Sequence, residues 1–116
     1  ERVVHERDAV WGAERAERKL AGDAPVPLGD DLLAVPTPGH TRGHMALLFR
    51  GRVLFSGDHV WWSPNLNSLH ASRNVCWHSW PEQMRSICRG LTLVRSASSP
   101  LGSYRRVGVN GRDETR

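Results

Sequence analysis

The sequence predicts a mixed α/β fold of the α+β kind, in which short strands and a hairpin precede one C-terminal helix. Apolar runs separated by Pro/Gly turns lie between residues 32 and 55, and a capped amphipathic pattern begins at Ser79. The 116 residues suffice for one modest core, but only 39% of them are hydrophobic. We therefore interpret the chain as a piece of a larger fold.

The first thirty residues indicate little regular structure beyond short extended pieces. Arg2–His5 is apolar and β-branched, which predicts a strand, and Val26–Leu28 predicts a second extended piece. Glu6–Lys19 is charged and weakly periodic. A helix with Trp11 on one face and a long irregular connection both stay open there, because Gly12 in the middle disfavours a helix.

Three apolar runs in the middle of the chain predict neighbouring strands, Leu32–Val35, Met45–Phe49 and Val53–Phe55. Pro36 and Pro38 end the first strand, because each lacks a backbone donor and fixes the chain in an extended or turned form. The tight turn Arg50–Arg52 suits a hairpin between the other two strands. The stretch Val60–Asn74 is aromatic at first and then loop-like.

The C-terminal part predicts one helix followed by a tail. Ser79 can cap the helix, Pro81 suits its first turn, and Glu82 occupies the capping-box position. Apolar residues then recur at helical spacing, namely Met84, Ile87, Cys88 and Leu91. We expect the helix to end near Gly90, residues 1–93 to form one partial domain, and residues 94–116 to be a poorly ordered or aberrant tail.

Charge and cysteine content narrow the classes of partner. The net charge is +4 and Lys19 is the only lysine, so arginine supplies the basic character. Nucleic-acid binding is one interpretation. We favour a solvated surface, because the arginines are scattered among acids. Two cysteines without a CxxC motif indicate two buried or half-buried thiols in a reducing, cytoplasmic compartment. No apolar run reaches about 18 residues, so we expect no membrane partner.

Candidate metal ligands follow two of the predicted strands. His40 lies in the PGHTRGH segment, and Asp58 ends the FSGD segment. Both would stand at the rim of a site, and imidazole and carboxylate groups are common ligands of divalent metals. The alternatives are a loop histidine satisfied by the backbone and an ordinary turn aspartate.

The PGHTRGH and FSGD segments together resemble the metallo-β-lactamase superfamily, in particular its hydroxyacylglutathione hydrolase (glyoxalase II) branch. The segment VCWHSWPEQMRSI resembles the helix that follows the site in that branch. The resemblance runs from about Arg2 to Leu91. It implies a four-layer αββα sandwich with the site along one edge of the two sheets.

The resemblance also implies roles for five residues. His40 would ligate a metal, and Asp58 would bridge two metals, zinc or alternatively iron or manganese. Behind these ligands, His44 would support the site, Thr41 would orient the loop, and His59 would line the edge. A metal pair lowers the pKa of a shared water, so hydroxide becomes available to attack a small-molecule thioester, lactone or related ester or amide.

The chain departs from the family pattern at both ends. It contains no His-x-His-x-Asp-His motif, and its C-terminal stretch SSPLGSYRRVGVNG lacks the family's last histidine. Catalytic zinc normally has about three protein ligands, and only two expected ligands are present. We therefore predict a metal-dependent hydrolase segment that is inactive by itself. A non-catalytic remnant or scaffold and a basic nucleic-acid-binding module are the alternatives.

Overall fold

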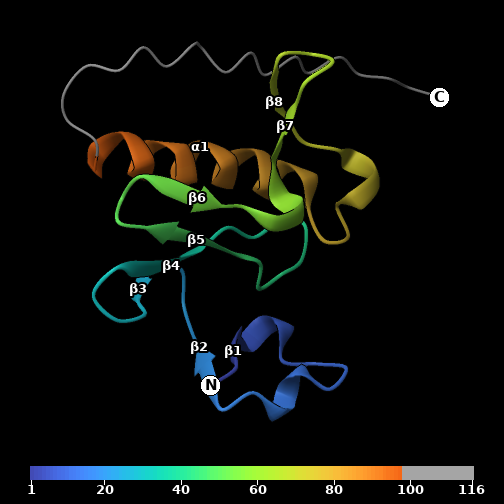
Figure 1. The fold of residues 1–116 in the computed structure, drawn as a ribbon. Helices are drawn as coiled ribbons and strands as arrows, with labels where there is room; N and C mark the ends of the chain where they lie inside the picture. The colour runs from blue at the N-terminus through green and yellow to red at the C-terminus, as the bar shows by residue number, and fades with distance from the viewer. Residues whose placement is uncertain (98–116) are drawn as a thin grey trace.

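A computed structural model describes the backbone of residues 1–97 and the side chains of residues 1–90. Its centre is a four-stranded antiparallel sheet in the order β3-β4-β5-β6. The strands are β3 (Val26–Pro27), β4 (Leu32–Pro36), β5 (Met45–Phe49) and β6 (Val53–Phe55). The single α-helix of the described residues, α1 (Trp80–Ala97), packs beside β6 (Figure 1). The predicted α+β class is confirmed at this level.

Pairing of the central strands follows from the turn chemistry. Strand β5 pairs with β4 from Pro36↔Met45 to Leu32↔Phe49, and with β6 around Leu48↔Leu54. Arg50 and Gly51 both take positive φ (49° and 66°), as a tight hairpin turn requires. These three strands and their hairpin lie where the sequence predicts them, and β4 extends one residue further, to Pro36.

The apolar core is small. Val35 and Leu48 are buried at its centre, and Leu33 and Leu54 pack against them. Helix α1 approaches closely at Gly90, where a Cβ would lie 3.7 Å from Cδ2 of Leu54. The thin core agrees with the modest hydrophobic content of the chain.

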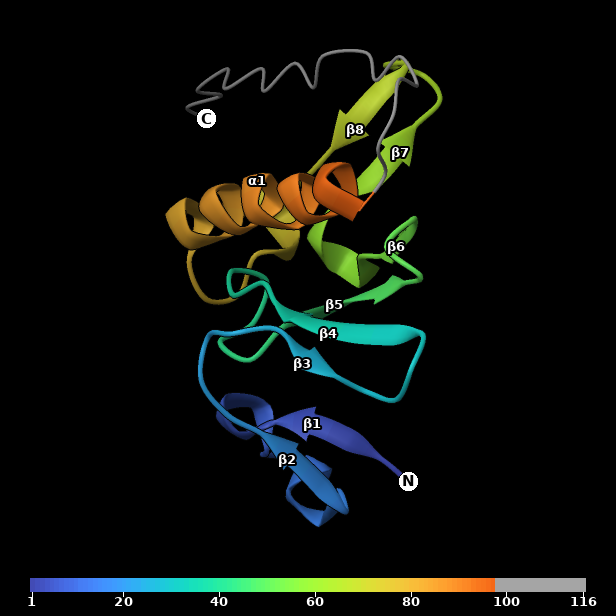
Figure 2. The same ribbon diagram turned by 90° about the vertical axis from the view of Figure 1, so that its left-hand side faces the viewer.

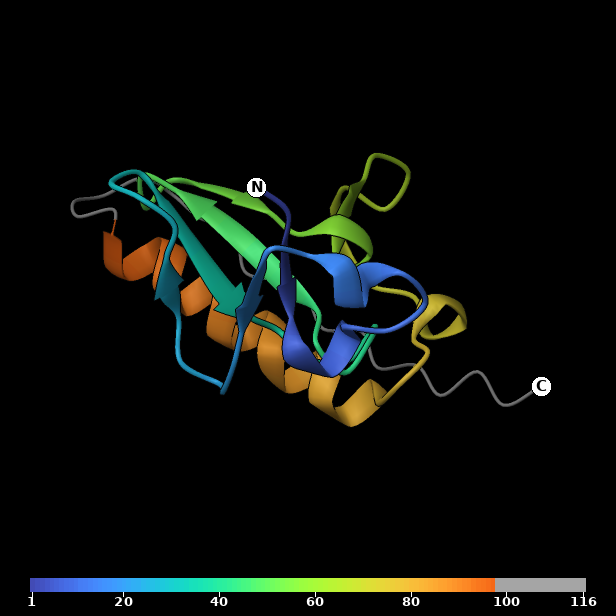
Figure 3. The same cartoon turned by 90° about the horizontal axis from the view of Figure 1, so that it is seen from below.

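The N-terminal segment forms a separate parallel pair, β1 (Val3–His5) with β2 (Arg18–Leu20). Figures 1 and 2 place this pair beyond β3, at the end of the molecule away from α1, and Figure 3 shows it in front of the sheet with α1 behind. Two 3₁₀ turns connect the strands, Glu6–Asp8 and Ala13–Arg15. The possible helix over Glu6–Lys19 is absent, because Trp11 and Gly12 take positive φ (56° and 96°), which no α-helix accommodates.

A second hairpin was not predicted. Strands β7 (Trp61–Ser63) and β8 (Ser68–His70) pair antiparallel and project from the rest of the molecule (Figure 2). Each strand has three residues, too few to show a period of two against the loop-like composition around them. A 3₁₀ turn at Arg73–Val75 then leads toward the helix.

Helix α1 begins as predicted but ends later. The Ser79 hydroxyl accepts a hydrogen bond from the Glu82 amide (3.4 Å), which confirms the predicted cap. The Glu82 carboxylate, however, pairs with the His78 ring (2.9 Å) instead of closing a capping box. The helix passes through Gly90 to Ala97, so the predicted end is wrong. A glycine inside a helix costs only about 1 kcal/mol. Residues 98–116 of the predicted tail lie outside the described residues.

The buried face of α1 differs from the apolar stripe in the sequence. Gln83, Ser86, Ile87 and Gly90 are buried, whereas Cys88 is exposed. The buried stripe keeps helical spacing but is turned by about one position, because polar groups on α1 bond to the loop beneath it. None of the described helices is both long and apolar enough to traverse a bilayer.

Candidate functional site

The sheet topology brings the two predicted ligands together. Strands β4 and β6 both run antiparallel to β5, so their C-terminal ends lie at the same edge of the sheet. The loop of residues 37–44 follows β4, and a 3₁₀ turn, Gly57–His59, follows β6. As a result, Nε2 of His40 lies 3.6 Å from Oδ2 of Asp58.

A hydrogen bond from its Nδ1 atom orients the His40 ring. Its Nδ1 atom is hydrogen-bonded to the carbonyl oxygen of Val75. A carbonyl only accepts hydrogen bonds, so Nδ1 must carry the proton. The other ring nitrogen, Nε2, then faces Asp58. Histidines that ligate metals commonly donate their second ring N–H to a carbonyl in this way.

The His40–Asp58 separation fits a shared divalent ion. Two ligands that each lie about 2.0–2.2 Å from a tetrahedral zinc are about 3.4 Å apart. The observed 3.6 Å is close to that value. Only 15% of the His40 side chain is exposed, against 77% for Asp58, so the ring is fixed while the carboxylate oxygens remain accessible.

The backbone of the His40 loop is fixed by the segment before α1. Four hydrogen bonds connect the two, from Cys76 Sγ (3.1 Å), His78 N (3.3 Å) and Ser79 N (3.0 Å) to the Gly39 carbonyl, and from Trp77 N (2.9 Å) to the His40 carbonyl. The same segment supplies the Val75 carbonyl. It therefore sets both the position and the ring orientation of His40.

Two glycines with positive φ lie beside the ligand pair, and Gly39 is the one that leaves no room for a side chain. Gly39 has φ +150°, and a Cβ there would lie 2.3 Å from Cα of Gln83 on α1. Gly57 has φ +55°, and a Cβ there would lie 3.4 Å from Nε2 of His44. Gly39 thus allows the loop to pack directly on the helix backbone.

Thr41 bonds to the N-terminal segment. Its hydroxyl donates to the Asp8 carboxylate, which also accepts from the Gly43 amide (2.8 Å). Asp8 lies in the turn after β1, so it ties that segment to the loop. The sequence does not single out Asp8, because this residue lies in a charged stretch with no motif to distinguish it.

His44 lies beside His40 without joining the ligand pair. Its Nδ1 is 2.9 Å from the Thr37 hydroxyl, and its ring meets the His40 ring edge-on, with centroids 5.7 Å apart. Burial, followed by the nearby His40, lowers the pKa of His44 below its usual value. The ring is therefore neutral at neutral pH.

His59 lies behind His44 and is buried. The two rings stack with centroids 5.1 Å apart, and Nε2 of His59 lies 3.0 Å from the Ser86 hydroxyl. Burial, with smaller contributions from His44 and His40, lowers the pKa of His59 to about 4. Ser86 also donates to the Pro38 carbonyl (2.8 Å).

The Ser86–His59 pair is poorly suited to nucleophilic catalysis. A histidine with a pKa of about 4 is a weak base at neutral pH. Its Nδ1 is buried and has no hydrogen-bond partner among the described residues, so no acid orients the ring. Ser86 and Gln83, both buried, were absent from the predicted site because their contacts are tertiary.

The described residues supply a pair of ligands and no more. Within residues 1–97, no group of three or more His, Cys, Asp or Glu side chains is arranged to hold a metal ion. His40 and Asp58 come together, His44 and His59 pack behind them, and Thr41 bonds to Asp8.

No protein-family profile, curated protein or solved structure matches the chain.

Proposed function

We propose that this chain carries part of the metal site of a hydrolase of the metallo-β-lactamase type, with His40 and Asp58 as ligands. The supporting observation is the orientation of His40: Nδ1 is hydrogen-bonded to Val75, and Nε2 lies 3.6 Å from the Asp58 carboxylate. An imidazole held in this way presents a lone pair beside an anionic ligand.

The architecture is compatible with this proposal. The antiparallel sheet with a helix beside it supports our proposal that these residues form one sheet-and-helix half of an αββα sandwich. The His40–Asp58 pair lies at one edge of that sheet, where β4 and β6 end. The proposal also requires a second sheet and helix to complete such a sandwich.

The residues around the pair suit a cationic centre. A bound zinc, iron or manganese ion would supply an acidified water and polarise a substrate carbonyl. Asp58 places negative charge there and remains accessible to a small ester, thioester, lactone or amide. His44 is neutral because its pKa is lowered, so it adds no positive charge beside the metal.

Two protein ligands hold a divalent ion weakly, since catalytic zinc sites usually have about three. We therefore propose that the 116-residue chain binds metal weakly and does not hydrolyse substrates unaided. Additional ligands would be needed for activity.

Isothermal titration calorimetry of chelator-treated protein with zinc tests the ligand assignment. We expect weak binding that His40→Ala or Asp58→Asn abolishes. The matched controls His70→Ala and Asp30→Asn remove the same chemical groups on β8 and in an exposed turn. They should leave binding unchanged. Titrations with Mn²⁺ and Fe²⁺ compare the candidate metals. Zinc binding that survives both site substitutions would overturn the proposal.

A non-catalytic module is the second candidate. The absence of a third ligand among the described residues favours it. On this reading the His40–Asp58 contact stabilises the sheet edge and binds no metal. The same titration separates the two, because the module predicts no heat of zinc binding in the parent chain.

A further inference from the structure

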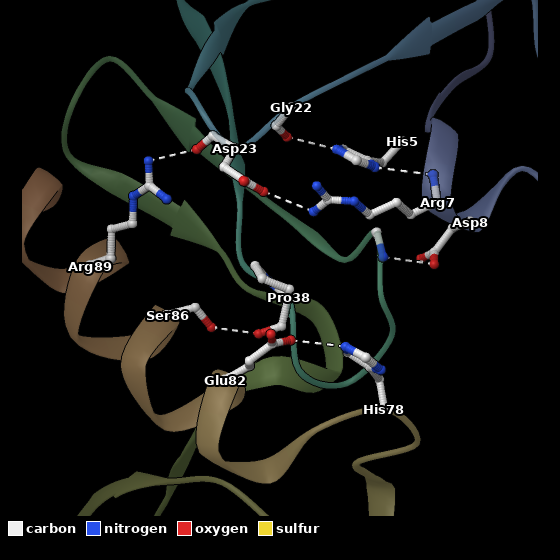
Figure 4. A network of polar contacts seen from close by, with 11 residues as sticks. His5, Arg7, Asp8, Gly22, Asp23, Pro38, His78, Glu82, Ser86 and Arg89 are labelled. Atoms are coloured by element: carbon white, nitrogen blue, oxygen red, sulfur yellow. Dashed lines mark hydrogen bonds and ion pairs between the residues drawn. The ribbon is translucent and has the colours of Figure 1, made fainter.

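A cleft of about 700 Å³ lies between α1 and the N-terminal segment. Figure 4 shows its walls, with Glu82, Ser86 and Arg89 on the helix and Arg7 and Asp23 opposite. Charged side chains line it, namely Arg7, Arg42, Arg85, Arg89, Asp23 and Glu82. Neither His40 nor Asp58 lines the cleft, so it is distinct from the metal-ligand pair.

Asp23 joins the two walls of the cleft. Its carboxylate pairs with the Arg7 guanidinium (2.8 Å), and its carbonyl accepts a hydrogen bond from Arg89 on α1 (2.6 Å). The hydrogen bond from Arg7 lowers the pKa of Asp23, so this carboxyl is ionised at neutral pH. Asp23 thus holds two arginines from different parts of the chain in place, Arg7 through its carboxylate and Arg89 through its backbone carbonyl.

The other two arginines have no such partner. Glu82, the second acid of the cleft, is engaged by the His78 ring (2.9 Å). Among the described side chains, no carboxylate lies within ion-pair distance of Arg42 or Arg85. Arg42 comes from the His40 loop and Arg85 from α1, so two unpaired guanidinium groups face one hollow.

We infer that this cleft binds a small organic dianion. Four arginines against two carboxylates leave a surplus of two positive charges. The volume falls in the range of about 300–1,000 Å³ typical of small-ligand sites. Guanidinium groups match the paired oxygens of phosphate and carboxylate. The shared chemistry is therefore two negative charges on oxygen, carried by a phosphate monoester or a dicarboxylate.

Titration of the chelator-treated chain with inorganic phosphate tests this inference, because chelation removes metal-bound phosphate as a cause of binding. We expect saturable binding that Arg85→Gln or Arg42→Gln weakens about tenfold or more. Arg52→Gln removes the same charge at an exposed turn outside the cleft and should bind like the parent. Arg85→Lys keeps the charge but loses the planar fork, so it should bind less tightly than the parent.

A parallel titration with succinate distinguishes the two sources of the dianion. Tighter phosphate binding indicates a phosphate monoester, and tighter succinate binding indicates a dicarboxylate. Binding of neither probe would overturn the inference, as would equal weakening by Arg52→Gln. Phosphate binding is measured on metal-free protein, so the cleft and the proposed metal site can fail separately. Far-UV circular dichroism verifies that each variant is folded.

Discussion

The backbone of Gly39 lies directly against Gln83 of α1. A Cβ at Gly39 would be 2.3 Å from Cα of Gln83, which is closer than two non-bonded carbon atoms can approach. The His40 loop therefore sits on the backbone of the helix, with no side chain between them. The geometry of His40 depends on this contact, since the next residue in the chain carries the imidazole.

Gly39→Ala should destabilise the protein by about 3 kcal/mol or more, because the methyl group forces the loop and helix apart in an unfavourable backbone region. Urea unfolding measures the change. Gly29→Ala is the matched control, since Gly29 also has positive φ (+88°) but has open space around it. It should cost only about 1–2 kcal/mol. Equal losses in the two variants would contradict the close packing.

Asp8→Ala should cost about 1–3 kcal/mol, because it leaves the Thr41 hydroxyl and the Gly43 amide without their acceptor. Combining it with Thr41→Val in a double-mutant cycle measures the coupling between the two side chains. The exposed neighbour Glu6 provides the control, and Glu6→Ala should change stability little. Additive effects of Asp8→Ala and Thr41→Val would show that the hydrogen bond contributes nothing.

Stability should fall as the pH is lowered from about 6.5 toward 4. The folded-state pKa of His59 is lowered to about 4, so the unfolded chain takes up a proton first. The resulting stabilisation is fully present above the unfolded pKa and is lost as the pH drops toward the folded one. Between about pH 7.5 and 5.5 the loss from His59 should be about 1 kcal/mol.

Urea unfolding of the parent and His59→Gln at these two pH values measures that contribution. Glutamine cannot titrate, so the pH-dependent loss should shrink by about 1 kcal/mol in the variant even if its absolute stability is lower. His70→Gln, at a partly exposed ring on β8, should retain the parent's slope. An unchanged slope in His59→Gln would mean that His59 titrates normally in the folded chain.

The His40 ring should carry its proton on Nδ1, because that atom faces the Val75 carbonyl. Long-range ¹H–¹⁵N correlation spectra at neutral pH in the absence of metal report the tautomer directly. We expect Nε2 to show the shift of an unprotonated ring nitrogen, and zinc to perturb that nitrogen first. A protonated Nε2 would remove the lone pair on which the proposed metal site depends.

Elements with strong local signals were predictable from sequence. Pro36 ends β4, the positive-φ turn at Gly51 closes the β5–β6 hairpin, and Ser79 caps α1. The closeness of His40 and Asp58 also follows from sequence reasoning, because they come after alternate strands of an antiparallel sheet. In such a sheet, alternate strands end at the same edge.

Features set by tertiary contacts were not predictable. The apolar periodicity of α1 gave no sign that Gln83 and Ser86 face inward, since their burial depends on bonds to the His59 and Pro38 carbonyls. The same holds for Asp8, whose partners lie more than thirty residues away. The end of α1 was misplaced because Gly90 is a local helix breaker in sequence but packs against Leu54 in the fold.

The imidazole rings of His40, His44 and His59 lie next to one another beside the proposed metal site. The nearby His40 contributes to the lowered pKa of both His44 and His59. A cation captured at the outermost ring would therefore shift the acid titration of two inner rings that never touch it. The proton resonances of these two histidines would therefore report whether the proposed site holds an ion, even when the ion itself gives no NMR signal.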